Sequence, residues 1–375
     1  MTPRVAIVHD WLVTWAGAER CLERFLALFP QASLHALIDH LPAPLRAGLH
    51  GRPVRTSWLQ SLPGVASWYR TALPLMPAAV RSLDLRGADL VLTSSHAVAK
   101  GVRIPRGARH VCYCYTPMRY AWDLRDQYLD GTGWTGLRRS AAGLLLDRLR
   151  DWDRRTADDV DDFLAISHVV AGRIARNYGR ESTVLYPPVD VEAFTPGGAR
   201  GEHFVTAGRL VPYKRVDVMV EAFRARPDLE LRVIGDGPES ARLRALAPAN
   251  VRYLGRVSES ALLDELRSAR AFLFGADEDF GIAPLEAQAC GTPVIAYGHG
   301  ATTETLRPLG GPDAPTAVFY DAQTPTSLGK AIERFEAEGS AITAAACRAN
   351  AARFARGRFD AELRGFLAAR GIDLG

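Results

Sequence analysis

Residues 271–296 read AFLFGADEDFGIAPLEAQACGTPVIA and combine, in this order, the features of a strand, a loop, a helix and a second strand. The apolar runs AFLF and PVIA are typical of strands that are buried on both faces of a parallel sheet. The polar segment between Gly275 and Gly281 predicts a loop. Pro284 suits the first turn of a helix, and Gly291 is expected to end that helix. The stretch therefore predicts a βαβ unit.

Two carboxylates lie in this unit, eight positions apart. Glu278 is expected in the loop at the carboxyl end of the first strand, and Glu286 in the first turn of the helix. Open α/β sheets bind ligands at that edge. Carboxylates hold ligand hydroxyls, and free amides at a helix N-terminus hold anions, so the pair suits a nucleotide sugar. Two ordinary acids at a helix start, favoured by about 0.3–1 kcal/mol, explain the same residues equally well.

Length and composition narrow the class of protein. A chain of 375 residues predicts two domains, and 47% hydrophobic with 23% charged residues is typical of a folded globular protein. The net charge of +4 is too small to indicate nucleic-acid binding. Five cysteines without a signal peptide indicate a reducing cytosol. No ligand pattern for a metal and no apolar run of membrane-spanning length is present, so neither a metal site nor a membrane span is expected.

The N-terminal half begins with an apolar run, RVAIVHDW, that predicts a buried strand ending near His9 and Asp10. Gly17 falls in the turn before the next predicted helix, where it permits a close backbone approach to a phosphate, although a plain turn explains it as well. A later strand, HVCYCYTPMRYAWD, places Tyr115 and Arg119 at or beyond its end. All these positions are expected at the ligand-binding edge of a parallel sheet.

Residues 51–82 interleave aromatic side chains with arginines, among them Trp58, Trp68, Tyr69 and Arg70. Such a segment suits a helix that lies on an anionic membrane surface. A pair of proline-broken helices that packs its aromatic rings inward explains the same pattern, and the sequence leaves both interpretations open.

The alternation of strands and helices occurs twice, which predicts an α/β fold of two Rossmann-like, doubly wound parallel-sheet domains that face each other across a ligand-binding cleft. The first domain is expected over residues 1–185. A Pro/Gly-rich linker follows over 186–200, and the second domain is expected over 201–352. Residues 353–375 predict a C-terminal helix that packs back toward the first domain.

Motifs in the second half resemble those of the retaining glycosyltransferases of family 4, which have the GT-B fold. They are Gly208-Arg209-Leu210, Lys214-Arg215, Gly235-Asp236-Gly237-Pro238-Glu239, the E-x7-E pair Glu278 and Glu286, and Cys290-Gly291-Thr292-Pro293-Val294-Ile295. The segments HDW, AGAER, SSHAVAKG and YTPMRYAWD resemble the bacterial branch that builds O-antigen and exopolysaccharide. Many members of that branch use GDP-mannose or related GDP-sugars.

The resemblance implies that the first domain binds the acceptor and the second the nucleotide sugar. It also implies a role for each matched residue. Arg209 and Lys214 would stabilise the departing diphosphate without a metal, and Glu278 would lie beside the transferred sugar. Other matched positions would bind the donor: Gly17, Gly208, Asp236, Gly237, Phe280, Gly281, Ile282 and Glu286.

On the acceptor side the candidates are His9, Asp10, Tyr115 and Arg119. Relatives carry a histidine at the position of Tyr115, in a segment reading YxHxPxRY. Tyrosine is a poor base at neutral pH but a fair hydrogen-bond donor, so a catalytic histidine is not expected there.

The resulting prediction is a retaining, metal-independent hexosyltransferase that needs no cofactor. It would move mannose or a GDP-deoxyhexose from a nucleotide diphosphate sugar to a lipid-linked glycan acceptor in bacterial surface polysaccharide and lipopolysaccharide synthesis. Its expected location is the cytoplasm, with peripheral contact to the inner membrane if residues 51–82 bind lipid. A catalytically silent scaffold subunit and a GT-B nucleotide-sugar epimerase are the alternatives. A dehydrogenase is disfavoured because no GxGxxG follows a strand, and the lack of a GK[ST] turn excludes a P-loop NTPase.

Overall fold

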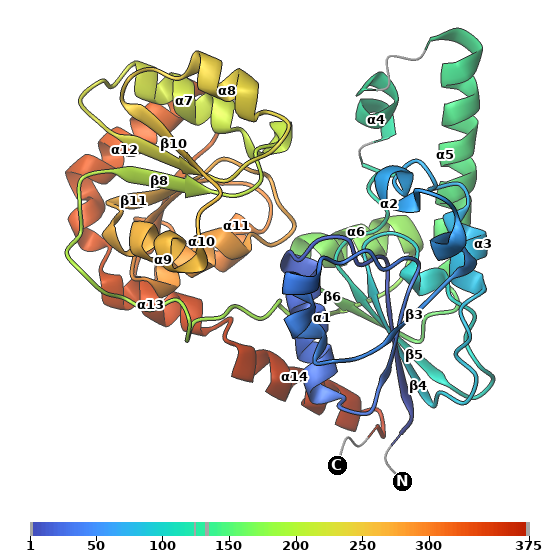
Figure 1. Ribbon diagram of the computed structural model, residues 1–375. Helices are drawn as coiled ribbons and strands as arrows, with labels where there is room; N and C mark the ends of the chain where they lie inside the picture. Colours follow the sequence, from blue (N-terminus) through green and yellow to red (C-terminus); the bar gives the residue numbers. More distant parts are fainter. Residues whose placement is uncertain (1–2, 124, 132–134, 373–375) are drawn as a thin grey trace. The chain divides into compact units, whose positions relative to one another are not determined.

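The computed structural model describes residues 3–123, 125–131 and 135–372. The chain divides into two compact units (Figure 1). Unit 1 comprises Met1–Pro187 and Phe359–Gly375, and unit 2 comprises Pro188–Arg358. Most of the segment 186–200, expected as a linker, therefore belongs to unit 2.

Unit 1 contains a seven-stranded parallel sheet with the strand order β3-β2-β1-β4-β5-β6-β7. The strands are β1 Val5–His9, β2 Ser33–Ala36, β3 Val54–Thr56, β4 Leu90–Ser95, β5 Arg109–Cys114, β6 Asp162–Ala165 and β7 Thr183–Val184. Successive strands are added on one side of β1 (β2, β3) and then on the other side (β4 to β7), so the strand order reverses between β1 and β4. In the register of these two strands His9 is paired with Ser94. Ligands of doubly wound sheets bind at such a switch point, beyond the carboxyl ends of the strands.

The helices of unit 1 are α1 Gly17–Leu28, α2 Val65–Trp68, α3 Met76–Arg81, α4 Arg125–Gly131, α5 Gly136–Thr156 and α6 His168–Tyr178, with the 3-10 turns η1 Ala43–Leu49, η2 Trp58–Ser61 and η3 Ala99–Gly101. The last helix, α14 Arg356–Ala368, also packs on this unit from Phe359 onward. Phe359 contacts Phe25 of α1 with ring centroids 5.7 Å apart, and Asp360 pairs with Arg24. Arg370 binds Asp162 of β6 at 2.6 Å.

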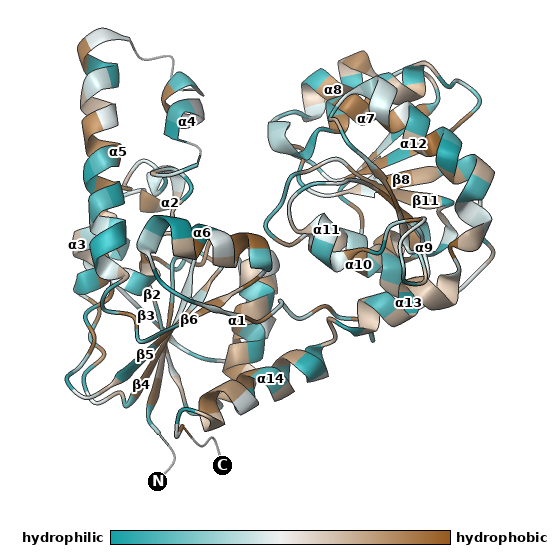
Figure 2. Cartoon of the chain, turned by 180° about the vertical axis from the view of Figure 1, so that it is seen from behind, coloured by the Kyte–Doolittle hydropathy of each residue, from teal (hydrophilic) through white to brown (hydrophobic). Residues whose placement is uncertain are grey.

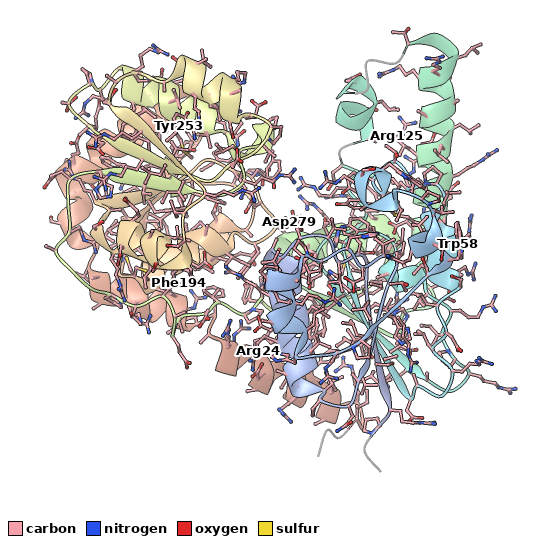
Figure 3. All side chains as sticks on the ribbon, viewed as in Figure 1. Arg24, Trp58, Arg125, Phe194, Tyr253 and Asp279 are labelled. Carbon is pink, nitrogen blue, oxygen red and sulfur yellow. The ribbon has the colours of Figure 1, made fainter. Side chains whose placement is uncertain are left out.

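Residues 51–82 form β3, η2, α2 and α3 rather than one long surface helix. Tyr69, Leu73 and Met76 are buried in the core that also contains Val8 of β1. Trp58 is 41% exposed and points outward (Figure 3). The inward-packing interpretation therefore describes most apolar side chains of this segment. Over the described residues, the structure contains no helix with the length and apolar character needed to span a bilayer.

Unit 2 contains a six-stranded parallel sheet with the order β10-β9-β8-β11-β12-β13. Its strands are β8 Phe204–Ala207, β9 Leu231–Ile234, β10 Val251–Gly255, β11 Ala271–Phe274, β12 Val294–Tyr297 and β13 Ala317–Tyr320. Its helices are α7 Val216–Arg224, α8 Ser240–Leu246, α9 Glu259–Ser268, α10 Ile282–Ala289, α11 Thr302–Thr305, α12 Pro325–Glu338 and α13 Ala344–Ala352, with η4 Pro212–Lys214 and η5 Gly339–Ala341. Figure 2 shows apolar strands within the sheets and helices of mixed hydropathy around them.

The predicted βαβ unit is confirmed, as β11, α10 and β12. Its helix starts one residue after Gly281, whose φ of +82° suits glycine, and Gly291 follows the end of the helix with a φ of +80°. Glu286 is the fifth residue of α10, so it lies in the second turn and not in the first as expected. The predicted pair of two doubly wound parallel-sheet units is also confirmed.

Candidate functional site

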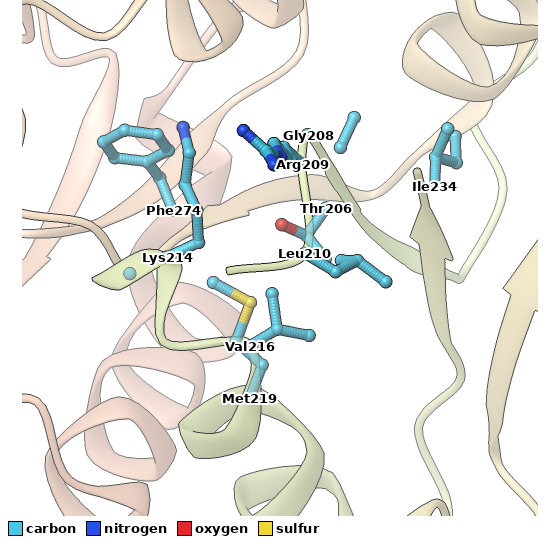
Figure 4. Close-up of a pocket in the computed structure, with 11 residues that line it drawn as sticks. Thr206, Gly208, Arg209, Leu210, Lys214, Val216, Met219, Ile234 and Phe274 are labelled. Atoms are coloured by element: carbon cyan, nitrogen blue, oxygen red, sulfur yellow. The ribbon is translucent and has the colours of Figure 1, made fainter. Parts of the chain in front are cut away.

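A pocket opens in unit 2 at the carboxyl ends of β8, β9 and β11, the sheet edge at which the sequence predicts the ligand (Figure 4). The residues that line it come from the last residues of β8, β9 and β11, from the loop after β8, from η4 and α7, and from the start of the loop after β11: Thr206, Ala207, Gly208, Arg209, Leu210, Lys214, Val216, Met219, Ile234, Phe274 and Gly275. The pocket thus contains both predicted cations, Arg209 and Lys214.

Two glycines let the loops after β8 and β9 approach each other beside this pocket. A Cβ on Gly235, whose φ is +125°, would lie 1.9 Å from the carbonyl oxygen of Gly208. A Cβ on Gly237 would lie 2.2 Å from the carbonyl oxygen of Leu210. Any larger residue at either position would push the two backbones apart, which explains the Gly-Asp-Gly sequence in physical terms.

Asp236, between these glycines, projects from the turn after β9 and is exposed. Its carboxylate accepts hydrogen bonds from the Ser240 hydroxyl at 2.7 Å and from the Gly237 amide at 2.8 Å. These two bonds hold the pKa of Asp236 below its usual range, because they favour the charged form. The turn therefore presents a fixed, ionised carboxylate.

Lys214 forms an ion pair with Glu278, which lies in the loop after β11 as predicted. Its Nζ also lies 5.5 Å from the ring centroid of Phe274 and 5.8 Å from that of Tyr213. The two aromatic rings restrict the lysine stem and add cation–π attraction. The first glutamate of the E-x7-E pair and the lysine therefore belong to one charged cluster.

Arg209 is exposed at the pocket, and among the residues that the structure describes its guanidinium has no carboxylate partner. Figure 4 shows the nitrogen ends of Arg209 and Lys214 on the same side of the pocket. An arginine without an acidic partner beside a lysine favours an anionic ligand, since its planar fork suits phosphate oxygens.

Arg215, the residue after Lys214, is fixed by contacts with the loop after β13. It has a φ of +53°, which is uncommon for a residue other than glycine. Its guanidinium donates to the side chain of Gln323 at 3.1 Å and to its carbonyl at 3.2 Å. Gln323 in turn donates to the carbonyl of Gly275 at 2.7 Å. Gln323 was missed by the sequence analysis, because a single glutamine after β13 carries no local signal of this contact.

The loop that carries Glu278 is fixed by the loop after β12. The Glu278 carbonyl accepts from the Ala301 amide at 3.1 Å, and Asp277 lies 3.0 Å from His299. Gly300 has a φ of +67°, and a Cβ there would lie 2.4 Å from Asp277 Oδ1. The conformation of residues 277–278 therefore depends on a glycine more than 20 positions away.

The remaining donor-side candidates surround the start of α10. Phe280 is buried, with its ring centroid 5.6 Å from that of Phe354. Gly281 is the N-cap and Ile282 the first helical residue, so the amides of this first turn have no acceptor within the helix. Glu286 is buried on the helix. These residues share the sheet edge with Glu278.

In unit 1, His9 and Asp10 follow the prediction in lying at the end of β1, but both are fully buried. His9 Nδ1 lies 3.0 Å from the Ser94 hydroxyl, and Nε2 lies 3.6 Å from Glu19. Both carboxylate oxygens of Asp10 accept hydrogen bonds from backbone amides of the loop after β4. Neither side chain is exposed, and the role of either in orienting an acceptor hydroxyl stays a prediction.

Tyr115 is likewise engaged inside unit 1. Its hydroxyl donates to the carbonyl of Ala18 at 2.9 Å and lies 2.9 Å from the Ser94 hydroxyl. Burial raises the pKa of Tyr115 well above its ordinary value, so it stays protonated. This side chain links β5, β4 and α1.

Gly17 and Arg119 complete the unit 1 candidates. Gly17 is the first residue of α1, so it does not lie in the turn before the helix as expected. Its helix starts with the Glu19 carboxylate accepting from the Ala16 amide at 2.9 Å. Arg119 is half-buried in the loop after β5.

The sequence of unit 2 matches a known family of proteins. The family model described as "Glycosyl transferases group 1" matches residues 199–354. A GDP-mannose-dependent monoacylated alpha-(1-6)-phosphatidylinositol monomannoside mannosyltransferase from Corynebacterium glutamicum is 33% identical over 189 residues, which are 42% of this chain and 50% of that protein. A D-inositol 3-phosphate glycosyltransferase from Geodermatophilus obscurus is 28% identical over 229 residues, 52% of this chain and 50% of that protein. The matches thus span about half the length of these relatives.

The fold has a close counterpart among solved structures. Anabaena HepE, crystallised with UDP and glucose, superposes with a TM-score of 0.70 over 98% of this chain and 100% of that chain, at 15% identity. Together with the two parallel sheets, this likeness identifies the fold as GT-B. The family match supports a glycosyltransferase origin for unit 2.

Proposed function

We propose that this chain is a retaining glycosyltransferase that moves a hexose from a nucleoside diphosphate sugar to a hydroxyl group of an acceptor. One observation carries the proposal: Lys214, which lines the pocket, is paired with Glu278, and the second cation of the pocket, Arg209, has no acidic partner among the described residues. A sugar nucleotide has a diphosphate for the cations and sugar hydroxyls for the carboxylate.

The chemistry follows from these charges. When the sugar C1–O bond breaks, negative charge grows on the departing diphosphate. Arg209 and Lys214 stabilise that charge, a task that a divalent metal performs in other enzymes. Glu278 orients Lys214 and accepts hydrogen bonds from sugar hydroxyls. We propose accordingly that transfer is independent of metals and of cofactors.

The nucleotide part of the donor would bind along the same sheet edge. Glu286 would accept the ribose hydroxyls, and Asp236 and Gly237 would lie near the base and ribose. The first amides of α10, at Gly281 and Ile282, suit the sugar and phosphate oxygens because a helix N-terminus favours anions. The name of the Corynebacterium relative supports GDP-mannose or another GDP-sugar as the donor.

The acceptor would be a lipid-linked glycan of bacterial surface polysaccharide, bound by unit 1. The same relative is named for an acylated phosphatidylinositol mannoside, which supports a lipid-bearing acceptor. The five cysteines are all free and buried, which supports a reducing cytoplasm as the location. We propose peripheral contact with the inner membrane surface, where such an acceptor is embedded.

A panel of GDP-, UDP-, ADP- and dTDP-sugars tests the function. Ligand binding raises the melting temperature by mass action, and we expect the largest shift with a GDP-sugar. Slow release of free sugar from that donor then establishes turnover. Binding without release would favour the silent scaffold subunit, and no shift with any donor would contradict the proposal.

A further inference from the structure

We propose that His96, held in place by Asp10, binds a hydroxyl group of the acceptor through its Nε2 atom. This inference rests on the proposed glycosyltransferase function and assigns the acceptor side of it. His96 directly follows β4, and Asp10 directly follows the neighbouring β1. Both therefore lie at the switch point of the unit 1 sheet, where ligands of such folds bind.

Asp10 is a buried anion with its charge satisfied by the loop after β4. Its Oδ2 accepts from the amides of His96 at 2.7 Å and Ala97 at 3.0 Å. Its Oδ1 accepts from the amides of Val98 and Ala99, both at 2.7 Å. Four amide donors therefore occupy both oxygens of this carboxylate as acceptors.

The same carboxylate orients the His96 ring. Nδ1 of His96 lies 3.1 Å from Asp10 Oδ2 without the geometry of a hydrogen bond, and the nearby carboxylate charge favours the hydrogen of a neutral imidazole on Nδ1. The ring also packs edge-on against Trp11, with centroids 4.6 Å apart. These two contacts leave Nε2 as the hydrogen-bond acceptor, and among the described residues no partner occupies it.

Exposure separates His96 from its polar neighbours. Its side chain is 24% exposed, whereas Asp10 is fully buried. His9 is also fully buried, and the Tyr115 hydroxyl is bonded to Ala18 and Ser94. Of these four side chains, that of His96 is the one exposed to solvent with a ring nitrogen that accepts no hydrogen bond from a described residue. The half-buried Trp11 beside it adds an apolar face of the kind that sugar rings pack against.

Burial favours the neutral form of His96 over the charged form. Burial lowers the pKa of His96, Asp10 and Glu19 oppose this shift, and His9 adds to it. The other titratable group facing the ring is Tyr115, whose ring centroid lies 6.3 Å away. A neutral ring accepts a hydrogen bond from a hydroxyl, and a protonated ring does not.

Replacing His96 separates acceptor binding from donor binding. Wild type, His96→Gln and the control His50→Asn are assayed with the donor panel and octyl α-D-mannopyranoside as the acceptor probe. We expect His96→Gln to lower kcat/KM for the acceptor by about 10- to 100-fold, the loss of one buried hydrogen bond, while the KM and melting shift of the donor stay unchanged. His50 is exposed, precedes β3 and has a φ of +51°, which asparagine tolerates, so its variant should match wild type.

Two different failures are distinguishable. An active wild type whose kinetics with the acceptor survive His96→Gln overturns the His96 assignment and leaves the proposed function standing. A wild type that binds no nucleotide sugar contradicts the proposed function instead.

The second measurement needs no turnover. Diethylpyrocarbonate, mapped by mass spectrometry, should modify His96 at pH 7, and octyl α-D-mannopyranoside should slow that reaction. A His96 that stays unmodified, or a rate that the probe does not change, overturns the inference.

Discussion

Lys214 and Glu278 form an ion pair at the carboxyl edge of the unit 2 sheet, with 18% and 20% of their side chains exposed. The pair is thus neither a buried structural bridge nor a freely solvated surface contact. Its position beside Arg209 at the pocket supports a role in ligand binding.

Removing either partner should therefore reduce turnover far more than stability. We expect Lys214→Ala and Glu278→Gln to lower kcat by about 10²-fold or more, the effect of losing one electrostatic contact to the transition state. Lys330→Ala, at an exposed lysine of α12, is the matched control and should leave kcat unchanged. Steady-state kinetics with the best donor of the panel measure this. Near-normal turnover in both variants would contradict the assignment of Lys214 and Glu278 to the active site.

Chelation tests whether the two cations replace a metal. If Arg209 and Lys214 alone stabilise the departing diphosphate, dialysis against EDTA should leave the transfer rate unchanged, and added Mg²⁺ or Mn²⁺ should not increase it. The rate is measured before and after dialysis on one preparation. An EDTA-treated protein that regains activity only with a divalent ion would contradict the cation-pair account.

Gly235 should be required for the shape of the pocket. A Cβ there would meet the Gly208 carbonyl oxygen at 1.9 Å, and the φ of +125° disfavours other residues. We expect Gly235→Ala to cost at least about 1–3 kcal/mol in urea unfolding and to abolish the donor-induced melting shift. Gly329→Ala is the control, because a Cβ in α12 meets nothing within 4 Å. The free energy of unfolding of the Gly329→Ala variant should rise by about 0.5–1 kcal/mol. Equal stability of the two variants would refute the close-approach argument.

The local pattern of residues 271–296 was sufficient to predict β11, α10 and β12, because strand and helix periodicity act over a few residues. The sequence predicts Glu286 in the first turn of α10, but it lies in the second turn. The difference arises because the helix begins after Gly281, whose positive φ makes it the N-cap. Which backbone conformation a glycine adopts is set by its surroundings.

Contacts between distant segments account for the other differences. Asp10 was predicted to face a ligand, yet it is enclosed by amides of residues 96–99. Gln323 reaches Arg215 from 108 positions away. Such pairs follow from strand order and loop packing, which no local sequence pattern encodes. The alternation of strands and helices limited the candidates to one sheet edge, but it left open which side chains point outward.

The pH dependence of stability should reflect buried neutral histidines. Burial lowers the pKa of His110 to about 4, and the ring is held by the Thr93 hydroxyl at 3.0 Å and the Asp159 carbonyl at 2.9 Å. The unfolded chain, with a histidine pKa near 6.5, binds more protons than the native one between pH 6.5 and 4, so stability falls as pH falls through that range.

The free energy of unfolding should change with pH by up to about 1.4 kcal/mol per pH unit because of this one histidine. His35, whose pKa burial also lowers to about 4, acts with the same sign. Urea unfolding at pH 7.5, 6.5, 5.5 and 4.5 measures the total, and His110→Gln should reduce the slope by the share of one group. The His50→Asn control should keep the full slope. A variant slope equal to that of wild type would show that His110 does not titrate as inferred.

Asp10 should act on the acceptor through His96, and the pH profile distinguishes that from a purely structural role. Because burial lowers the pKa of His96, kcat/KM for the acceptor should fall only below pH 6.5, as the ring gains a proton and stops accepting. The Asp10 charge raises the pKa of His96, so Asp10→Asn should move this acidic limb to lower pH. The rate should also fall, since Nδ1 loses its carboxylate partner. Asp84→Asn, at an exposed acid of unit 1, should leave the limb in place. If Asp10→Asn lowers the rate but the limb stays where it is in wild type, Asp10 only holds the loop after β4, and the His96 assignment loses its support.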